Sequence, residues 1–217
     1  ISLGLVGSEM CIRDSVSIGQ VAHRISASEL QDKGILANCH VNIIQTEDFV
    51  AYKTYQEEQK YLTTTKTRMG FVANEIKDIA QSGNTLILVN YVKTGELLEE
   101  LIDDAVFVSG KTKVQDRKDE YDEIKTASNK IIIATYGVAA VGINIPRIFN
   151  LVLIEPGKSF VRVIQSIGRG IRKAQDKDHV QIWDITSTAK FAKRHLTARK
   201  KFYKEANYPY TITKKEN

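Results

Sequence analysis

The sequence has few of the residues from which metal centres and disulfide frameworks are built. Its 217 residues include two cysteines, Cys11 and Cys39, and four histidines, and none of these lies at the spacing of metal ligands. This use of cysteine fits a reducing compartment, so we expect a cytoplasmic protein with no metal site. No apolar run approaches the length of a membrane span, and no membrane partner is expected.

The composition of the sequence is typical of a globular chain, with more basic than acidic residues. Hydrophobic residues make up 42% of the chain and charged residues 26%. The formal net charge is +5, which is compatible with a polyanionic partner but is shared by many unrelated proteins. The length is sufficient for one domain with a real core, plus extensions.

Short apolar runs alternate with helical patterns from residue 41 onward. The runs of strand length are residues 41–45, 85–90, 105–108, 131–134, 151–154 and 180–185. This alternation predicts an α/β fold in which helices sandwich a parallel β-sheet. We expect the domain to occupy residues 41–186 and residues 180–185 to close the sheet, and we expect residues 187–217 to form a basic helical extension.

A predicted helix from about residue 160 separates two faces. Gln165, Arg169 and Arg172 share one face, and a guanidinium forks two hydrogen bonds onto a phosphate. Two arginines one turn apart beside a sheet edge therefore suit a polyphosphate, and an ordinary solvated face is the alternative. The opposite face is an apolar stripe of Phe160, Val163, Ile164, Ile167 and Ile171.

Residues 165–172 read Gln-Ser-Ile-Gly-Arg-Gly-Ile-Arg, which closely resembles motif VI (Q-x-x-G-R-x-x-R) of superfamily 2 helicases. Residues 135–146 resemble motif V, and the two motifs stand in the order and spacing of that family. Residues 53–58 and 136–138 look most similar to phage branch-migrating and recombination DNA helicases. The resemblance implies a RecA-like fold and the second, C-terminal motor domain of an ATP-dependent DNA helicase or translocase.

The resemblance also implies roles for individual residues. Arg169 and Arg172 would be arginine fingers that reach the γ-phosphate of ATP, with Gln165 hydrogen-bonding nearby. The residues expected close to the nucleotide are Gly142, Asn144 and Gly168.

A second implied group would contact the nucleic-acid backbone. It comprises the motif V residues Thr135 and Tyr136, the motif IV residues Asn90 and Tyr91, and the segment Ser109, Gly110 and Lys111. For the segment 109–111 a simple strand-to-helix turn is the alternative. It cannot be a P-loop, because that pattern needs a glycine where this chain has Ala105.

The chain has no G-x-x-x-x-G-K-[ST] loop and no D-E-x-H box. In superfamily 2 these motifs lie on the first motor domain, so the resemblance implies that Mg²⁺ and most contacts to ATP belong to an N-terminal RecA-like domain. We therefore expect this fragment alone to be inactive, with single-stranded or branched DNA as its other partner. The competing hypothesis is a non-enzymatic, basic α/β module that binds nucleic acid.

The two ends of the chain carry separate predictions. Residues 1–15 resemble the translation of a sequencing adaptor, and residues 16–40 are predicted to be a linker into the motor domain. The basic tail after residue 190, with interleaved tyrosines, is either a surface that tracks a nucleic-acid backbone or a solvated helix.

Overall fold

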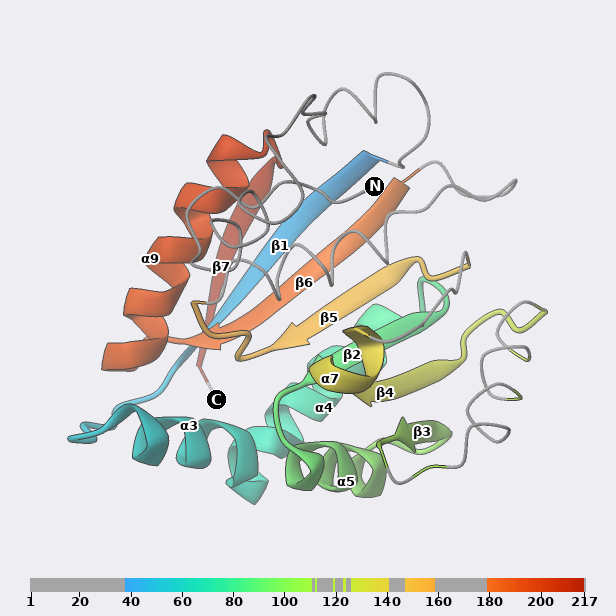
Figure 1. Ribbon diagram of the computed structural model, residues 1–217, viewed down its shortest axis with the longest axis horizontal. Coiled ribbons are helices and arrows are strands. Elements are labelled where there is room, and N and C mark those ends of the chain that lie inside the picture. The colour runs from blue at the N-terminus through green and yellow to red at the C-terminus, as the bar shows by residue number, and fades with distance from the viewer. Residues whose placement is uncertain are drawn as a thin grey trace, which may run out of the picture.

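The computed structural model describes residues 38–110, 112, 119, 123, 126–140, 147–158 and 179–216. Within them, seven strands form one sheet in the order β3-β4-β2-β5-β6-β1-β7, and every neighbouring pair is parallel (Figure 1). The strands are β1 (Asn38–Glu47), β2 (Thr85–Val89), β3 (Ala105–Val108), β4 (Ile131–Thr135), β5 (Asn150–Ile154), β6 (His179–Ser187) and β7 (Tyr210–Glu216). The helices are α3 (Tyr55–Thr64), α4 (Lys66–Ala80), α5 (Val92–Leu101), α7 (Tyr136–Ala140) and α9 (Lys190–Glu205).

The central strands are apolar throughout because both of their faces are covered. In β2, Leu86 and Leu88 face one side of the sheet, whereas Ile87 and Val89 face the other, and all four are buried. Successive side chains of a strand point to opposite faces, so a strand between two helical layers needs apolar residues at every position. The six predicted strands are all present, and the predicted α/β fold class is confirmed.

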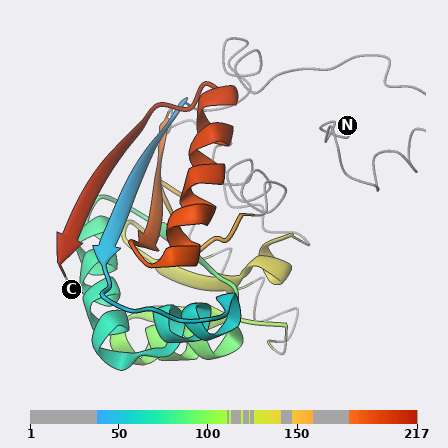
Figure 2. The ribbon, with the colours of Figure 1, turned by 90° about the vertical axis from the view of Figure 1, so that its left-hand side faces the viewer.

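Two helical layers cover the sheet, one on each face (Figure 2). On one face, α7 and α9 pack against the strands, and α9 contributes Leu196, Phe202 and Tyr203. On the other face, α4 and α5 form the cover, with Met69 and Val72 of α4 fully buried. None of the described helices is long and apolar enough to cross a membrane.

The C-terminal segment differs from its prediction. The basic helix is present as α9, but the chain then returns as β7, which pairs in parallel with β1. Strand β6, predicted to close the sheet, lies inside it between β5 and β1. The sheet therefore extends beyond residue 186, and a helical extension describes only the first part of residues 187–217.

The N-terminal boundary also shifts slightly. Strand β1 begins at Asn38, inside the range 16–40 that was predicted to be a linker. The prediction for residues 1–15, and most of that for 16–40, lies outside the described residues. After β1, the chain enters α3 through a capping box in which Thr54 and Glu57 satisfy each other's backbone N–H groups.

Candidate functional site

The residues that the motifs predict to contact nucleic acid lie along one edge of the sheet. Asn90 and Tyr91 follow β2, Ser109 follows β3, and Thr135 ends β4. These three strands are neighbours in the order β3-β4-β2, and all are parallel, so their carboxyl ends meet at the same edge (Figure 1). Ligands of open α/β sheets bind at this edge. Residues up to 45 positions apart in the sequence are thus brought onto a single surface. We call this surface the ledge; its described residues are Asn90, Tyr91, Ser109, Gly110, Thr135 and Tyr136.

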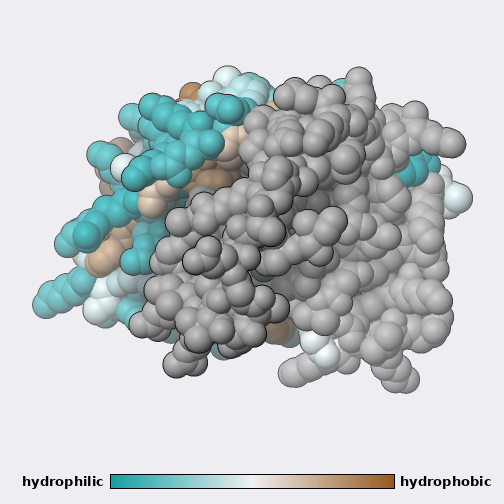
Figure 3. All heavy atoms as spheres, turned by 45° about the horizontal axis from the view of Figure 1, so that its top comes forward, coloured by the Kyte–Doolittle hydropathy of each residue, from teal (hydrophilic) through white to brown (hydrophobic). Residues whose placement is uncertain are grey.

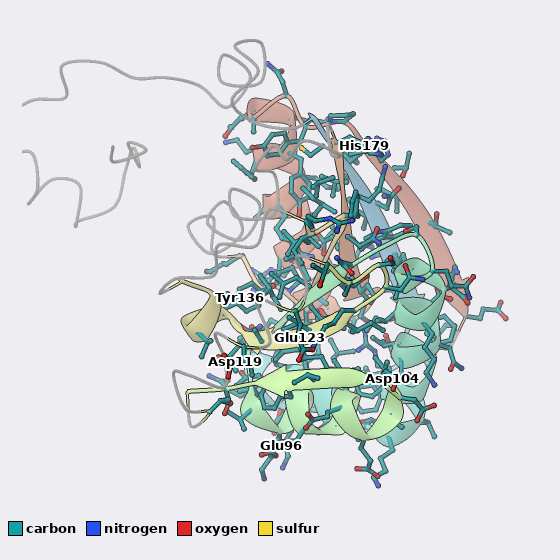
Figure 4. The ribbon with its side chains drawn as sticks, turned by 90° about the vertical axis from the view of Figure 1, so that its right-hand side faces the viewer. Glu96, Asp104, Asp119, Glu123, Tyr136 and His179 are labelled. Carbon is teal, nitrogen blue, oxygen red and sulfur yellow. The ribbon has the colours of Figure 1, made fainter. Side chains whose placement is uncertain are left out.

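At the end of β4, the two motif V residues lie in different environments. Thr135 is half-buried, and its hydroxyl accepts a long hydrogen bond (3.4 Å) from the N–H of Val138 in the first turn of α7. Tyr136 begins α7 (Figure 4). Its ring is buried among the core residues of the face that α7 and α9 cover. The ring of Tyr136 is therefore not presented to a bound strand, which leaves only its backbone for the predicted contact.

The residues after β2 combine a fixed amide with an exposed ring. The amide of Asn90 donates to the carbonyl of Glu155 at 2.9 Å, which ties the end of β2 to the end of β5. Tyr91 is 46% exposed and precedes α5, with its carbonyl accepting from Thr94 and Gly95. Tyr91 is therefore the aromatic side chain that the ledge offers to a ligand.

The residues after β3 form a tight turn. Ser109 is buried, its N–H donates to the hydroxyl of Thr112 at 3.0 Å, and its carbonyl accepts from the N–H of Thr112 at 3.1 Å. Gly110 is exposed, and a Cβ there would meet nothing within 4 Å. This geometry is compatible with both interpretations of the segment, a backbone contact and a simple turn. Lys111 lies outside the described residues.

The predicted nucleotide-facing residues all lie outside the described residues as well. They are Gly142, Asn144, Gln165, Gly168, Arg169 and Arg172.

A buried ionic network beside this ledge was not predicted. Arg68 of α4 is 2% exposed and pairs with Asp48 at 3.2 Å and with Glu155 at 2.7 Å. Its guanidinium also donates to the carbonyl of Leu62 and to the hydroxyl of Thr46. One cation therefore joins the carboxyl ends of β1 and β5 to the α3–α4 corner.

Glu155 is the unusual member of that network. It follows β5 directly, has a positive φ of 41°, and is 3% exposed. Burial raises the pKa of its carboxyl to about 7, against the opposing effects of Arg68 and Arg199. The hydroxyl of Thr186 donates to its second oxygen at 3.1 Å. Near neutral pH this carboxyl is therefore poised between its two protonation states.

A second buried pair fixes α9 to the sheet. Arg199 donates to both oxygens of Asp184, at 2.8 and 2.9 Å, and to the carbonyl of Gly157 at 2.8 Å. Tyr203 donates its hydroxyl to Asp184 at 2.9 Å. Burial acts to lower the pKa of Arg199, but the Asp184 carboxylate outweighs burial, so the pKa lies above its usual value. Burial and the same carboxylate raise the pKa of Tyr203.

These contacts hold the segment after β5 against α9, and a cavity of about 540 Å³ opens there. The sequence did not predict this cavity, because neither the basic tail nor the segment near residue 55 has a pattern that indicates contact between them. Its lining residues are Tyr55, Asn90, Pro156, Gly157, Lys158, Phe191, Arg194 and His195.

The fold and the ledge define the class of protein as a RecA-like α/β domain with its ligand edge at the carboxyl ends of β2, β3 and β4. Residues 67–174 match the family model for the helicase conserved C-terminal domain. The chain therefore contains a helicase conserved C-terminal domain.

One sequence relative and two solved structures are similar to this chain. The chain is 28% identical over 201 residues to the ATP-dependent DNA helicase uvsW of Enterobacteria phage T4. The matched region covers 88% of this chain and 40% of that protein. The crystal structure of T4 UvsW superposes with a TM-score of 0.71 at 22% identity, over 83% of this chain and 42% of that one. S. cerevisiae Dbp5 bound to RNA and ADP BeF3 gives a TM-score of 0.66 at 15% identity, over 96% of this chain and 49% of that one. The chain thus spans less than half the length of each of these proteins.

Proposed function

We propose that this chain is the second motor domain of a cytoplasmic, ATP-dependent DNA helicase or translocase. The observation that carries the proposal is the ledge: residues matching motifs IV and V, far apart in the sequence, end neighbouring strands within a domain of the helicase C-terminal family. DNA is the proposed partner because the T4 relative is named a DNA helicase.

In this proposal the ledge holds a single or branched DNA strand by its backbone. The hydroxyl of Thr135, the backbone of Tyr136 and the turn from Ser109 to Lys111 would contact phosphates, and Tyr91 would lie against the strand. Contacts of this kind fix a strand without reading its sequence, which suits a motor that moves along DNA.

The proposed catalytic contribution comes from the motif VI residues. Arg169 and Arg172 would reach the γ-phosphate of ATP held by an N-terminal RecA-like domain, which would also bind Mg²⁺, with Gln165 hydrogen-bonding nearby. Gly142, Asn144 and Gly168 would line the nucleotide. An arginine finger contributes about 10³–10⁵ in rate, roughly 4–7 kcal/mol of barrier. A surface ion pair contributes only about 0–1 kcal/mol. Arginines that reach ATP would therefore contribute far more to the reaction than ordinary surface charges, even though the rest of the ATP site would lie on the N-terminal domain.

ATP would then couple domain closure to movement. Nucleotide bridges the two motor domains, and a strand gripped by both domains shifts when the bridge forms and breaks. The ledge of this chain supplies one of the two grips.

The test compares the 217-residue chain with a longer protein that joins it to its N-terminal motor domain. We expect the longer protein to hydrolyse ATP faster when single-stranded DNA is added, and the 217-residue chain alone to hydrolyse none. A longer protein that binds DNA without hydrolysing ATP would instead establish the non-enzymatic module.

A further inference from the structure

The cavity between α3, α9 and the segment after β5 lies beyond the helicase motifs. Of its lining residues, only Asn90 belongs to the ledge. Tyr55 begins α3, Phe191 and His195 lie in the first two turns of α9, and Lys158 follows β5. Because α3 follows β1 and α9 follows β6, all of these groups lie at the same carboxyl edge as the ledge (Figure 1). The cavity therefore continues the ledge toward the β1 side of the sheet.

The cavity is positively charged. Lys158 and Arg194 are both exposed, and neither has a carboxylate partner within the described part of the chain. No aspartate or glutamate is among the residues that line the cavity. Figure 3 shows hydrophilic atoms on the side of the molecule where α9 lies, and the exposed cation Lys190 begins this helix.

The cations, rather than the start of the helix, would bind an anion here. The N–H groups of Phe191 and Ala192 already donate to the carboxylate of Glu58, at 2.7–3.1 Å, and Glu58 is 1% exposed. These two backbone donors in the first turn of α9 are thus occupied. Long cationic side chains at the mouth of the cavity remain, and these are the groups that suit a phosphate.

Three aromatic side chains form one part of the cavity wall: Tyr55, Phe191 and His195. The ring of Tyr55 lies 4.8 Å from His195 and 6.3 Å from Phe191, measured between centroids. The ring of Phe191 is half-buried, with the ammonium group of Lys190 at 5.3 Å from its centroid. Aromatic faces beside cations are the elements from which proteins build platforms for unpaired bases.

The wall is also held in place before any ligand arrives. Gly157 has a φ of +64°, its carbonyl accepts from Arg199, and a Cβ at this position would come within 3.7 Å of the hydroxyl of Tyr55. Asn90 is tied to Glu155 by its amide. A preformed wall lowers the entropy cost of binding, and about 540 Å³ lies within the range of small-ligand sites.

We infer that this cavity binds one nucleotide of a single strand that leaves the ledge, with its phosphate on Lys158 and Arg194 and its base against Phe191 and Tyr55. The inference rests on the proposed function, because the ledge delivers the strand. It adds a subsite built from α3 and α9, which lie outside or at the margin of the family match.

His195 provides an internal reporter of this site. Burial and the nearby cations Arg199, Lys158 and Arg194 lower the pKa of His195, and Tyr55 is the titratable group facing it from α3. A phosphate bound among these cations would offset their charge. The pKa of His195 should therefore rise when an oligonucleotide binds, as measured by NMR titration of the imidazole. A pKa that stays the same at saturating oligonucleotide contradicts the inference.

Mutagenesis supplies the second test, with fluorescein-labelled oligo(dT) and the 217-residue chain in the absence of ATP. Lys158→Ala and Arg194→Ala should each weaken binding, and the double variant should lower the slope of log K against log salt by about 0.7, the value for one phosphate contact on a single strand. Phe191→Leu should weaken binding about tenfold without changing that slope. Lys193→Ala is the matched control, because it removes the same charge from the same helix outside the cavity.

The outcomes of this test are distinct from those of the test of the proposed function. Equal losses for Lys193→Ala and Arg194→Ala, or full affinity in a folded Phe191→Leu variant, would overturn the inference. This test needs no ATP, whereas the proposed function is decided by ATP hydrolysis in the longer protein. Failure of the cavity assignment therefore leaves the motor assignment intact, and failure of ATP hydrolysis leaves the binding data intact.

Discussion

Replacing Glu155 by glutamine should change how the stability of the domain depends on pH. Glu155 is 3% exposed, pairs with Arg68 at 2.7 Å, and has a pKa raised to about 7 by burial. Glutamine keeps the shape of the side chain and resembles the protonated carboxyl, but it cannot ionise. The variant therefore isolates the titration of this one group.

The direction in which pH changes the free energy of unfolding follows from proton binding. Between the ordinary value of 4.5 and about 7, the folded state keeps a proton on Glu155 that the unfolded state has lost. The free energy of unfolding therefore has its full contribution from this group below pH 4.5 and loses it as the pH rises through 7. At 1.36 kcal/mol for each unit of pKa, the loss is about 3 kcal/mol.

Urea denaturation of the 217-residue chain at pH 5, 6, 7 and 8 measures this loss. Relative to the unmodified chain, Glu155→Gln should gain about 2–3 kcal/mol between pH 5 and pH 8, because pH 5 already lies above the ordinary value of 4.5. Glu96→Gln, which changes an exposed carboxyl on α5 (Figure 4), is the matched control for the loss of one carboxyl group. Parallel pH profiles for the Glu155→Gln and unmodified chains would show that the pKa of Glu155 is not raised in the folded protein.

Three further substitutions test separate contacts in the structure. Arg199→Met should cost about 3–5 kcal/mol of stability in urea denaturation, because it leaves the buried carboxylate of Asp184 without its cation; a loss below about 1 kcal/mol would argue against a structural role. Thr54→Ala should cost about 1 kcal/mol by removing the capping box of α3, and an unchanged urea midpoint would show that the cap contributes nothing. Thr135→Val should weaken oligonucleotide binding several-fold with stability retained, and undiminished affinity would remove this hydroxyl from the interface.

The fold could be predicted where both faces of a strand are buried. Residues such as Ile131 to Ala134 must be apolar at every position, and that pattern is visible in the sequence. Strand β7 was missed because it is an edge strand, largely exposed and rich in threonine and lysine. An edge strand needs only one hydrogen-bonded neighbour and tolerates charge, so it leaves no apolar run to detect.

The ledge could be predicted because its residues follow the strands directly, and parallel strands bring those positions together. The buried network could not, because Arg68 on an amphipathic helix has the same pattern as a solvated cation. One signal for Glu155 was available: an acid immediately after a fully buried strand is more enclosed than an average acid. Burial of the Tyr136 ring depends on how α7 packs, which the motif string does not encode.

The arginine-finger proposal is tested by the rate of DNA-stimulated ATP hydrolysis in the longer protein carrying Arg169→Ala, with Lys193→Ala as the control. We expect turnover to fall by about 10³-fold or more in Arg169→Ala, oligonucleotide affinity to stay near its original value, and Lys193→Ala to keep full turnover. Normal turnover in Arg169→Ala would exclude an arginine finger at this position, because the chain would then contribute no catalytic cation to the motor.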